Sequence, residues 1–302
     1  MACYSPVTGY LARTPNKNGK RPVVFNRSAG FVDKPLTVPC GQCIGCRIDK
    51  SRMWAIRCVH ESKLHTSNSF VTLTYDDDKL PLHGSLQKKD LQDFFKRARH
   101  IYGNFRYYAS GEYGDNTQRP HYHIMFFGID FSEDRKLYKH NQRSDILYKS
   151  DSLNKCWGLG FCTIGSFNYA TAAYTARYAI KKVSGKLADE HYSRVDPRTG
   201  EFLSVEHEFA IMSRRPGIGS GWYDKFKSDA FPSDFLIYQG KKHSVPRFYT
   251  DKLKKEDLST HKEIKYTRKA NQEKNKANST PDRLAVREEC KKSQIKSLKR
   301  SI

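Results

Sequence analysis

The sequence predicts an α+β fold in which a central antiparallel sheet is flanked by helices. Three runs are rich in β-branched and aromatic residues and are bounded by turn formers, which is typical of strands, at 69–76, 105–112 and 121–128. Segments with apolar residues at helical spacing precede, separate and follow these runs. At 302 residues the chain is long enough to bury a sizeable core, in one large domain or two small ones.

The chain is strongly basic. Its 54 Lys and Arg residues outnumber 32 Asp and Glu, which leaves a formal net charge of +22. Such an excess favours a polyanionic partner, because cations that neutralise phosphates release counterions. Aromatic residues make up 13% of the chain, and rings interleaved with cations suit single-stranded nucleic acid. A ribosome-associated or membrane-surface protein can carry the same charge, so the signal is broad.

Membrane and secretory signals are missing from the sequence. No run approaches the roughly 20 apolar residues of a membrane span. The first twenty residues, MACYSPVTGYLARTPNKNGK, contain no apolar segment typical of a signal peptide. We therefore expect an intracellular protein with no membrane partner. In a reducing compartment its eight cysteines are expected to be buried or to bind metal rather than to form disulfides.

The N-terminal part combines an irregular arm with a cysteine cluster. Residues 1–39 show no sustained period and predict one short strand at 22–25, and a basic amphipathic helix follows over 47–64. Between them lie Cys40, Cys43 and Cys46, and thiolates at this spacing suit a structural zinc ion. The candidates for the fourth ligand are Cys58, His60 and the distant Cys3. Cysteines without a ligand and an iron–sulfur cluster are the alternatives, although the Cys-Pro ending of a ferredoxin-type run is missing.

The middle of the chain predicts a sheet that carries two histidines. The strand 69–76 ends at acidic residues and Pro81, and a helix capped by Ser85 follows, with Leu86, Leu91, Phe94 and Phe95 on its apolar side. The strands 105–112 and 121–128 form a hairpin around the turn-rich YGDNTQRP.

The predicted hairpin would create a metal site. Because side chains alternate along a strand, His121 and His123 point to one face, and the hairpin brings Glu112 back beside His121. Two imidazoles and a carboxylate suit a divalent ion with open positions, which can take phosphate oxygens and water. The alternative is a pair of ordinary surface or core histidines.

A helix farther along the chain carries candidate nucleophiles. Residues 130–156 look rich in loop, and 157–167 can supply another strand. From Asn168 to Gly185 the sequence predicts a helix on which Tyr174, Tyr178 and Lys181 share a face, with Lys182 beside them. A phenol with its pKa near 10 needs help to lose its proton, and a nearby ammonium gives that help. Alternatively, the tyrosines are core residues and the lysines interact with the helix dipole.

The remainder of the chain carries no recognisable ATP motor. The GIGSG stretch lacks the lysine of a P-loop and predicts a loop within a region of short strands, 186–250. The tail 251–302 has twice as many basic as acidic residues, and we expect it to be partly helical at best, flexible, and a diffuse contact for nucleic acid. The predicted organisation is an arm with a basic helix (1–65), a core (66–190), an accessory region (191–250) and the tail.

Three stretches, FVTLTYDD, RPHYHIMFFG and YTARYAIKK, resemble in this order the motifs of the HUH endonucleases, the rolling-circle replication initiators. Tyr122 fills the hydrophobic position between the two histidines. The spacing, together with CGQCIGCRIDKSRMWAIR and SGEYGDNTQRPHYH, is similar to the initiators of the Microviridae, single-stranded DNA phages, and especially to their gokushovirus branch. The resemblance covers about residues 36–220 and leaves the tail outside.

The resemblance implies a ferredoxin-like or RRM-like core that cuts and rejoins DNA. It assigns His121 and His123 to Mg²⁺ or Mn²⁺, with Glu112 as the third ligand on geometry and Gln118 as a weaker candidate. It assigns Tyr174 or Tyr178 to attack on DNA, which leaves a 5′-phosphotyrosine bond and a free 3′-OH primer. Lys181 would assist the tyrosine, and Lys182 would contact DNA.

The implied partners are single-stranded origin DNA of the viral replicative form and the host replication machinery. No helicase motif occurs in the sequence, so we expect a host helicase and polymerase to complete the process, in the cytoplasm of an infected bacterium. The alternatives are a plasmid-type relaxase, a single-tyrosine transposase and a non-catalytic, zinc-stabilised nucleic-acid-binding protein. The tyrosine pair followed by two lysines argues against the transposase.

Overall fold

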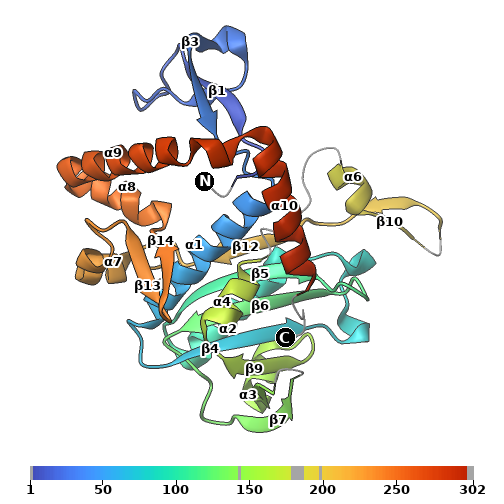
Figure 1. Cartoon of the computed structure of the whole chain (residues 1–302). Coiled ribbons are helices and arrows are strands. Elements are labelled where there is room, and N and C mark those ends of the chain that lie inside the picture. Colours follow the sequence, from blue (N-terminus) through green and yellow to red (C-terminus); the bar gives the residue numbers. More distant parts are fainter. Residues whose placement is uncertain (1–2, 142–143, 178–186, 197–198, 298–302) are drawn as a thin grey trace. The chain divides into compact units, whose positions relative to one another are not determined.

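The computed structural model describes residues 3–141, 144–177, 187–196 and 199–297 (Figure 1). Tyr178, Lys181, Lys182 and Gly185 therefore lie outside the described residues. The chain divides into two compact units, a larger one built from residues 50–264 and a smaller one built from residues 1–49 and 265–299. The helices α1 (Ile44–Ser62) and α9 (Leu258–Lys274) contribute residues to both units.

The larger unit is built around a seven-stranded antiparallel sheet, which confirms the predicted α+β class. In spatial order its strands are β12 (Phe209–Met212), β5 (Arg106–Tyr113), β6 (Pro120–Phe127), β4 (Asn68–Thr74), β9 (Cys162–Ser166), β8 (Ile146–Lys149) and β7 (Lys136–His140). The predicted strands near 69, 105, 121 and 157–167 correspond to β4, β5, β6 and β9. As predicted, β4 lies beside β6 in the interior of the sheet.

The centre of the sheet has the ferredoxin-like order. Along the chain, β4 leads to α2 (Lys88–Tyr102), β5, β6, α3 (Asp151–Trp157) and β9, and the four strands lie in the order β5-β6-β4-β9. Both helices pack on the same face, where their apolar side chains meet Val71, Tyr122 and Ile124 of the sheet. The opposite face of the sheet is thereby left for other elements.

That opposite face is covered by α1 and α4 (Tyr169–Thr175), as Figure 1 shows. Ala55 and Cys58 of α1 and Ala172 of α4 pack on side chains from β4, β5 and β6, namely Phe70, Tyr108, Met125 and Phe127. Strand alternation explains the division, because consecutive residues of one strand enter the two different cores. The hydroxyl of Ser51 on α1 donates a hydrogen bond of 3.2 Å to the carbonyl of Ala173, which fixes α4 against α1.

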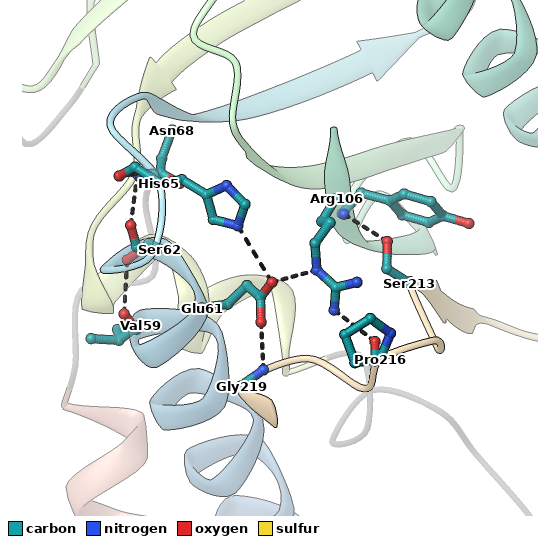
Figure 2. A network of polar contacts seen from close by, with 10 residues as sticks. Val59, Glu61, Ser62, His65, Asn68, Arg106, Ser213, Pro216 and Gly219 are labelled. Atoms are coloured by element: carbon teal, nitrogen blue, oxygen red, sulfur yellow. Dashed lines mark hydrogen bonds and ion pairs between the residues drawn. The ribbon is translucent and has the colours of Figure 1, made fainter. Parts of the chain in front are cut away.

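A buried carboxylate attaches the segment after β12 to the sheet. Glu61, at the end of α1, is 3% exposed and forms an ion pair with Arg106 at the start of β5 (Figure 2). Its second oxygen accepts a hydrogen bond of 2.6 Å from the backbone N–H of Gly219, and Arg106 donates one of 2.7 Å to the carbonyl of Pro216. Charged and well-bonded partners offset the cost of burying this carboxylate. The loop 213–219, which includes part of the predicted GIGSG loop, is held in place.

Beyond this loop the chain forms a second core with α1. Its elements are α7 (Ser220–Phe226), a 3₁₀ turn at Lys227–Asp229, the hairpin β13 (Phe235–Tyr238) and β14 (Lys241–Ser244), and α8 (Arg247–Glu256). Trp222, Tyr223 and Tyr249 are the large buried side chains here. His60 of α1 stacks on Trp222 with 3.5 Å between ring centroids, and its Nδ1 lies 3.0 Å from the hydroxyl of Tyr249.

Three expectations about local structure were wrong. Residues 130–156 hold β7, β8 and α3, whose single apolar turn gives too short a periodicity to predict. The helix expected after Ser85 begins at Lys88, because the Ser85 hydroxyl instead accepts the N–H of Glu206. The tail expected to be partly helical at best forms α8, α9 and α10 (Pro281–Lys296), since it is rich in strong helix formers and Thr280 caps α10 before Pro281.

The smaller unit holds a three-stranded antiparallel sheet in the order β2-β1-β3. Its strands are β1 (Val7–Ala12), β2 (Val23–Val24) and β3 (Gly30–Val38), with 3₁₀ turns at Arg27–Ala29 and Lys276–Ser279. The short strand expected at 22–25 corresponds to β2. In the larger unit, 3₁₀ turns at Asp77–Lys79 and Leu82–Gly84, helix α6 (Leu187–His191), and the hairpin β10 (Ser193–Val195) and β11 (Phe202–Ser204) complete the fold. None of the described helices combines the length and apolarity needed to cross a membrane.

The buried His60 makes stability depend on pH. Burial, with a smaller effect of Lys63, lowers the pKa of His60 to about 3. Because the unfolded chain binds this proton more readily than the folded one, stability is lost as the pH falls from the ordinary histidine pKa towards 3. We expect the free energy of unfolding to drop by about 2 kcal/mol from this group between about pH 8 and pH 5.

Urea denaturation of the wild type and of His60→Phe at several pH values measures this contribution. The Phe variant should lose that part of the pH dependence, whereas His100→Gln, a change at an exposed histidine of α2, should retain it. Equal pH slopes for the wild type and His60→Phe would contradict the assignment.

Candidate functional site

Glu112, His121 and His123 come together on the face of the sheet that α1 and α4 cover. The register of β5 and β6 pairs Glu112 with His121 and Ser110 with His123, so the three side chains share one face, as the hairpin predicted. One ligand atom from each residue lies within 4.8 Å of the others. The Nε2 atoms of His121 and His123 lie 3.3 and 3.0 Å from Oε1 of Glu112.

Neighbouring groups fix the orientation of both imidazoles. Nδ1 of His121 lies 3.2 Å from the carbonyl oxygen of Arg119, which can only accept, so Nδ1 carries the proton and Nε2 is left to face Glu112. Nδ1 of His123 lies 3.0 Å from the hydroxyl of Thr72 on β4, the residue paired with His123 in the β4–β6 register. Metal-binding histidines commonly have such partners on their second nitrogen.

Thr72 is a residue of the site that the sequence analysis missed. The strand 69–76 was expected to contribute scaffold rather than chemistry. Alternation already placed Thr72 on the same face as Phe70 and Thr74, but only the pairing register shows that this face carries the histidines.

The electrostatics of the group keep Glu112 ionised. Burial alone would raise its pKa, since the side chain is only 2% exposed. Hydrogen bonds from His121 and His123 and their charges outweigh burial and hold the pKa of Glu112 well below its usual range. A buried carboxylate and two imidazoles that face it therefore form an anionic centre open to a cation.

The donor set also fits a divalent cation by its spacing. In octahedral coordination with bonds of about 2.1 Å, neighbouring ligand atoms lie about 3.0 Å apart. The two distances from Oε1 to the imidazole nitrogens, 3.0 and 3.3 Å, match this spacing. Gln118, the weaker candidate for the third ligand, lies in the turn between β5 and β6 with φ 52°, and its carbonyl accepts a hydrogen bond from Arg194.

Tyr174 reaches the same group from α4. The helix begins at the cap residue Asn168, whose side chain and that of Thr171 each accept the other's backbone N–H, as the sequence predicted for this end. The Tyr174 hydroxyl donates a hydrogen bond of 3.3 Å to Oε1 of Glu112, and its ring meets that of His123 edge to face at 4.9 Å. Burial, followed by the charge of Glu112 and this hydrogen bond, raises the pKa of Tyr174 above its usual range.

The helix that carries Tyr174 is shorter than predicted. The sequence analysis expected it to continue to Gly185, but α4 ends at Thr175, and the N–H of Arg177 bonds to the carbonyl of Tyr174 three residues earlier. This tighter turn interrupts the α-helical spacing. The expected shared face of Tyr174, Tyr178 and Lys181 therefore stays a prediction, and the last two residues, with Lys182, lie outside the described residues.

A second group in the smaller unit consists of four cysteines, Cys3, Cys40, Cys43 and Cys46, whose sulfur atoms lie within 4.8 Å of one another. The Sγ atom of Cys3 lies 3.7 Å from that of Cys40 and 3.9 Å from that of Cys43. A tetrahedron with zinc–sulfur bonds of about 2.3 Å has edges of about 3.8 Å, so these sulfurs fit a zinc ion.

Backbone N–H groups point at several of these sulfurs. Tyr4 N–H donates to Cys43 and Cys40 N–H donates to Cys3, each over 3.3 Å. Burial raises the pKa of the Cys43 thiol, but hydrogen bonds from the N–H groups of Tyr4 and Cys46 bring it down to about 7. Such bonds stabilise the thiolate form that binds metal.

Of the three candidates for the fourth cysteine-site ligand, only Cys3 joins this group. Cys58 is fully buried among apolar side chains of α1, α4 and the sheet, where burial raises its pKa. His60 stacks on Trp222 in the second core. Proximity in sequence favoured Cys58 and His60, whereas the chain returns to Cys3 only through the pairing of β1 with β3.

Comparison with known proteins gives one consistent result. The family model of the replication-associated protein ORF2 matches residues 68–183, a span from β4 past α4. No solved structure matches the chain significantly.

Relatives from phages cover much more of the chain. It is 32% identical to the replication-associated protein VP4 of Bdellovibrio phage phiMH2K, over 72% of this chain and 67% of that protein. It is 32% identical to the replication-associated protein ORF2 of Spiroplasma virus 4, over 73% and 68%. With ORF4 of Chlamydia phage 1 the identity is 26%, over 72% and 54%. The chain therefore belongs to the phage replication-associated proteins, initiators of rolling-circle replication of the Microviridae type.

Proposed function

We propose that this protein is an HUH-type endonuclease and strand transferase that nicks the viral origin with a tyrosine. The observation that carries the proposal is the position of Tyr174, whose hydroxyl lies 3.3 Å from Oε1 of Glu112 beside two imidazoles. A nucleophilic side chain next to a group suited to a divalent cation is the arrangement that tyrosine transesterification needs. Membership in a family of replication-associated phage proteins supports the same reading.

The proposed reaction exchanges one phosphoester for another. The phenol oxygen attacks the origin phosphorus, the bond from phosphorus to the 3′ oxygen breaks, and the 5′ phosphate stays on the tyrosine. The proton lost by the phenol balances the proton gained by the 3′ oxygen, which becomes the free 3′-OH primer. Because a phosphodiester is conserved, neither nicking nor rejoining needs ATP. The reverse reaction, with the 3′-OH of the displaced strand as the attacking group, closes the released circle.

Glu112, His121 and His123 would hold the cation, for which we propose Mg²⁺ or Mn²⁺. A bound divalent cation supplies charge neutralisation and orientation at the attacked phosphate. Thr72 and the carbonyl of Arg119 hold the imidazoles in position, while Glu112 places the phenol at the edge of the group. The raised pKa of Tyr174 means that attack needs cationic help, from the ion or from Lys181.

The remaining assignments are proposals on the same basis. Tyr178 would provide the second nucleophile for the second cut, and Lys182 would contact DNA. The partners would be single-stranded origin DNA of the replicative form and, for unwinding and synthesis, a host helicase and polymerase. The site of action would be the cytoplasm of the infected bacterium. Zinc is proposed for the four cysteines, on the fit of their sulfur positions to a tetrahedron.

The first prediction concerns the covalent intermediate. Incubating the protein and Mn²⁺ with single-stranded oligonucleotides that tile the genome encoding it should give a shifted band on a denaturing protein gel. Tyr174→Phe and Tyr178→Phe should each abolish strand transfer, since each removes one nucleophilic oxygen, with losses of several orders of magnitude. The change at the tyrosine that attacks first should also abolish the adduct.

Tyr138→Phe is the matched control, because this exposed tyrosine lies on the edge strand β7. It should form the adduct like the wild type. Strand transfer that survives either Tyr174→Phe or Tyr178→Phe would refute the two-tyrosine scheme. No adduct with any divalent metal would favour a non-catalytic, zinc-stabilised binding protein, whereas an adduct from one tyrosine alone would favour a relaxase or transposase.

A second prediction tests the role of Thr72. Thr72→Val keeps the shape of the side chain but removes the hydroxyl that contacts Nδ1 of His123. Loss of such an orienting partner should weaken Mn²⁺ binding by about 10- to 100-fold, measured by isothermal titration calorimetry. Thr163→Val is the control, because Thr163 pairs with Thr72 from β9 and lies one strand farther from His123. Equal Mn²⁺ affinity of wild type and Thr72→Val would contradict the assignment.

A third prediction tests the cysteine group. Purified protein should contain about one zinc ion per chain by atomic absorption, because four thiolates complete a closed structural site. Cys3→Ser should lose most of this zinc and lower the melting temperature. Cys290→Ser, at an exposed cysteine of α10, should change neither. Full zinc content in Cys3→Ser would exclude Cys3 as a ligand.

A further inference from the structure

A pocket of about 130 Å³ opens between α1 and the start of α8. Four of its lining residues, Lys50, Met53, Trp54 and Arg57, follow one another at helical spacing and form a single stripe along α1. The others are Pro246, Arg247 and Phe248. The volume is several times the roughly 30 Å³ that one water molecule occupies. Three cations and two aromatic rings therefore surround one small hollow.

The interior of the pocket is a stack of rings and a guanidinium. The central carbon of Arg57 lies 4.1 Å from the ring centre of Trp54 and 4.0 Å from that of Phe248. Its Nε also donates a hydrogen bond of 3.0 Å to the carbonyl of Ile218, which fixes the guanidinium in place. Taken alone, this stack is an ordinary stabilising contact. It also presents a rigid flat surface of the kind on which nucleobases stack.

The rim of the pocket is cationic. Lys50 and Arg247 are exposed, and among the described residues that line the pocket there is no carboxylate. Arg247 faces Asp251 one turn along α8 at 3.5 Å, but both side chains are largely exposed, so this ion pair constrains the arginine only weakly. Two exposed cations beside a fixed aromatic surface match one nucleotide, with its phosphate at the rim and its base in the hollow.

The pocket also lies close to Tyr174. Ser51, which follows Lys50, donates its hydroxyl hydrogen bond to Ala173, the residue before Tyr174. Trp54 packs in the same cluster as Ala173 and Tyr174, on the face of the sheet that carries the histidines. A DNA strand that leaves Tyr174 along α1 would reach this pocket first.

A second basic pocket is the obvious competitor. It lies between α2 and α3, has a volume of about 650 Å³, and includes Lys96, Arg97 and Lys155 in its lining. These helices cover the face of the sheet opposite to Tyr174. Among its described lining residues there is no Phe, Tyr or Trp on which a base would stack.

We propose that the pocket formed by Lys50, Trp54, Arg57, Arg247 and Phe248 binds a nucleotide of single-stranded DNA next to the strand that the tyrosine attacks. The proposal rests on the proposed function for its ligand. It assigns stacking to Trp54 and Phe248 and phosphate contact to Lys50 and Arg247. Neither the sequence motifs nor the metal-binding group accounts for this cluster of side chains.

The test is the salt dependence of binding to a fluorescein-labelled oligothymidylate, followed by anisotropy without added divalent metal, so that no cutting intervenes. For single strands the slope of log affinity against log salt falls by about 0.7 for each phosphate contact removed. The double variant Lys50→Gln/Arg247→Gln should therefore lower the slope by about 1.4. Both side chains are exposed, so the variant is expected to fold, which circular dichroism checks.

The control is Lys96→Gln/Lys155→Gln, which removes the same charge from the competing pocket and should leave the slope unchanged. A slope that falls equally in both variants would show a diffuse electrostatic contact and overturn the proposal. A fall in the control alone would move the nucleotide site to the pocket between α2 and α3.

Tryptophan fluorescence gives a second readout that reports on stacking. Trp157 and Trp222 are almost completely buried, whereas Trp54 is partly exposed, so the oligonucleotide should quench the wild-type emission through Trp54. Trp54→Phe should remove the quenching and keep most of the affinity, while Trp54→Leu should weaken binding at least about fivefold. Unchanged quenching in Trp54→Phe would overturn the proposal.

The pocket and the proposed function fail in different ways. If the wild type binds the oligonucleotide but forms no covalent adduct with Mn²⁺, the tyrosine chemistry is wrong while the pocket stands. If the adduct forms and the pocket variants bind with wild-type slope and quenching, the pocket proposal is wrong while the tyrosine chemistry stands.

Discussion

The antiparallel register of β4, β5 and β6 is the constraint on which the site depends. It sets Glu112 opposite His121 and both Ser110 and Thr72 opposite His123, so three strands place their polar groups on one face. A slip of one residue in β6 would turn both histidines into the core beneath α2 and bring Tyr122 to the surface of the site. The hydroxyl of Tyr122 helps to prevent this slip, because it bonds to Gln87 and Tyr75 on the other face.

The sequence predicts this centre well because the decisive information is local. Alternation places His121 and His123 on one face, and a hairpin needs only the turn between its strands to bring Glu112 back. Thr72 and Cys3 show the limit of such reasoning. Thr72 meets His123 through a pairing fifty-one residues apart, and Cys3 meets Cys40 across thirty-seven, so nothing near either residue indicates its partner.

The errors in the helices have a related cause. Leu153, Cys156 and Trp157 form one apolar turn, which acquires meaning only when it packs beside α2. The end of α4 at Thr175 has no breaker in the sequence, since alanines and an arginine follow, and the tighter hydrogen bond of Arg177 ends it. Helix propensity alone therefore overestimates α4 and underestimates the tail, where strong helix formers continue with few buried side chains, Ile264 and Leu284 among them.

The outer strand β12 has a consequence for how the protein behaves in concentrated solution. It is only four residues long, and a buried carboxylate holds the chain on each side of it. Before it, Glu208 accepts the hydroxyl of Tyr192, and after it, Glu61 binds the N–H of Gly219. Short edge strands that cannot lengthen give a second chain little backbone to pair with. A protein that must present a sheet face to DNA is thereby protected at this edge from joining other copies of itself into aggregates.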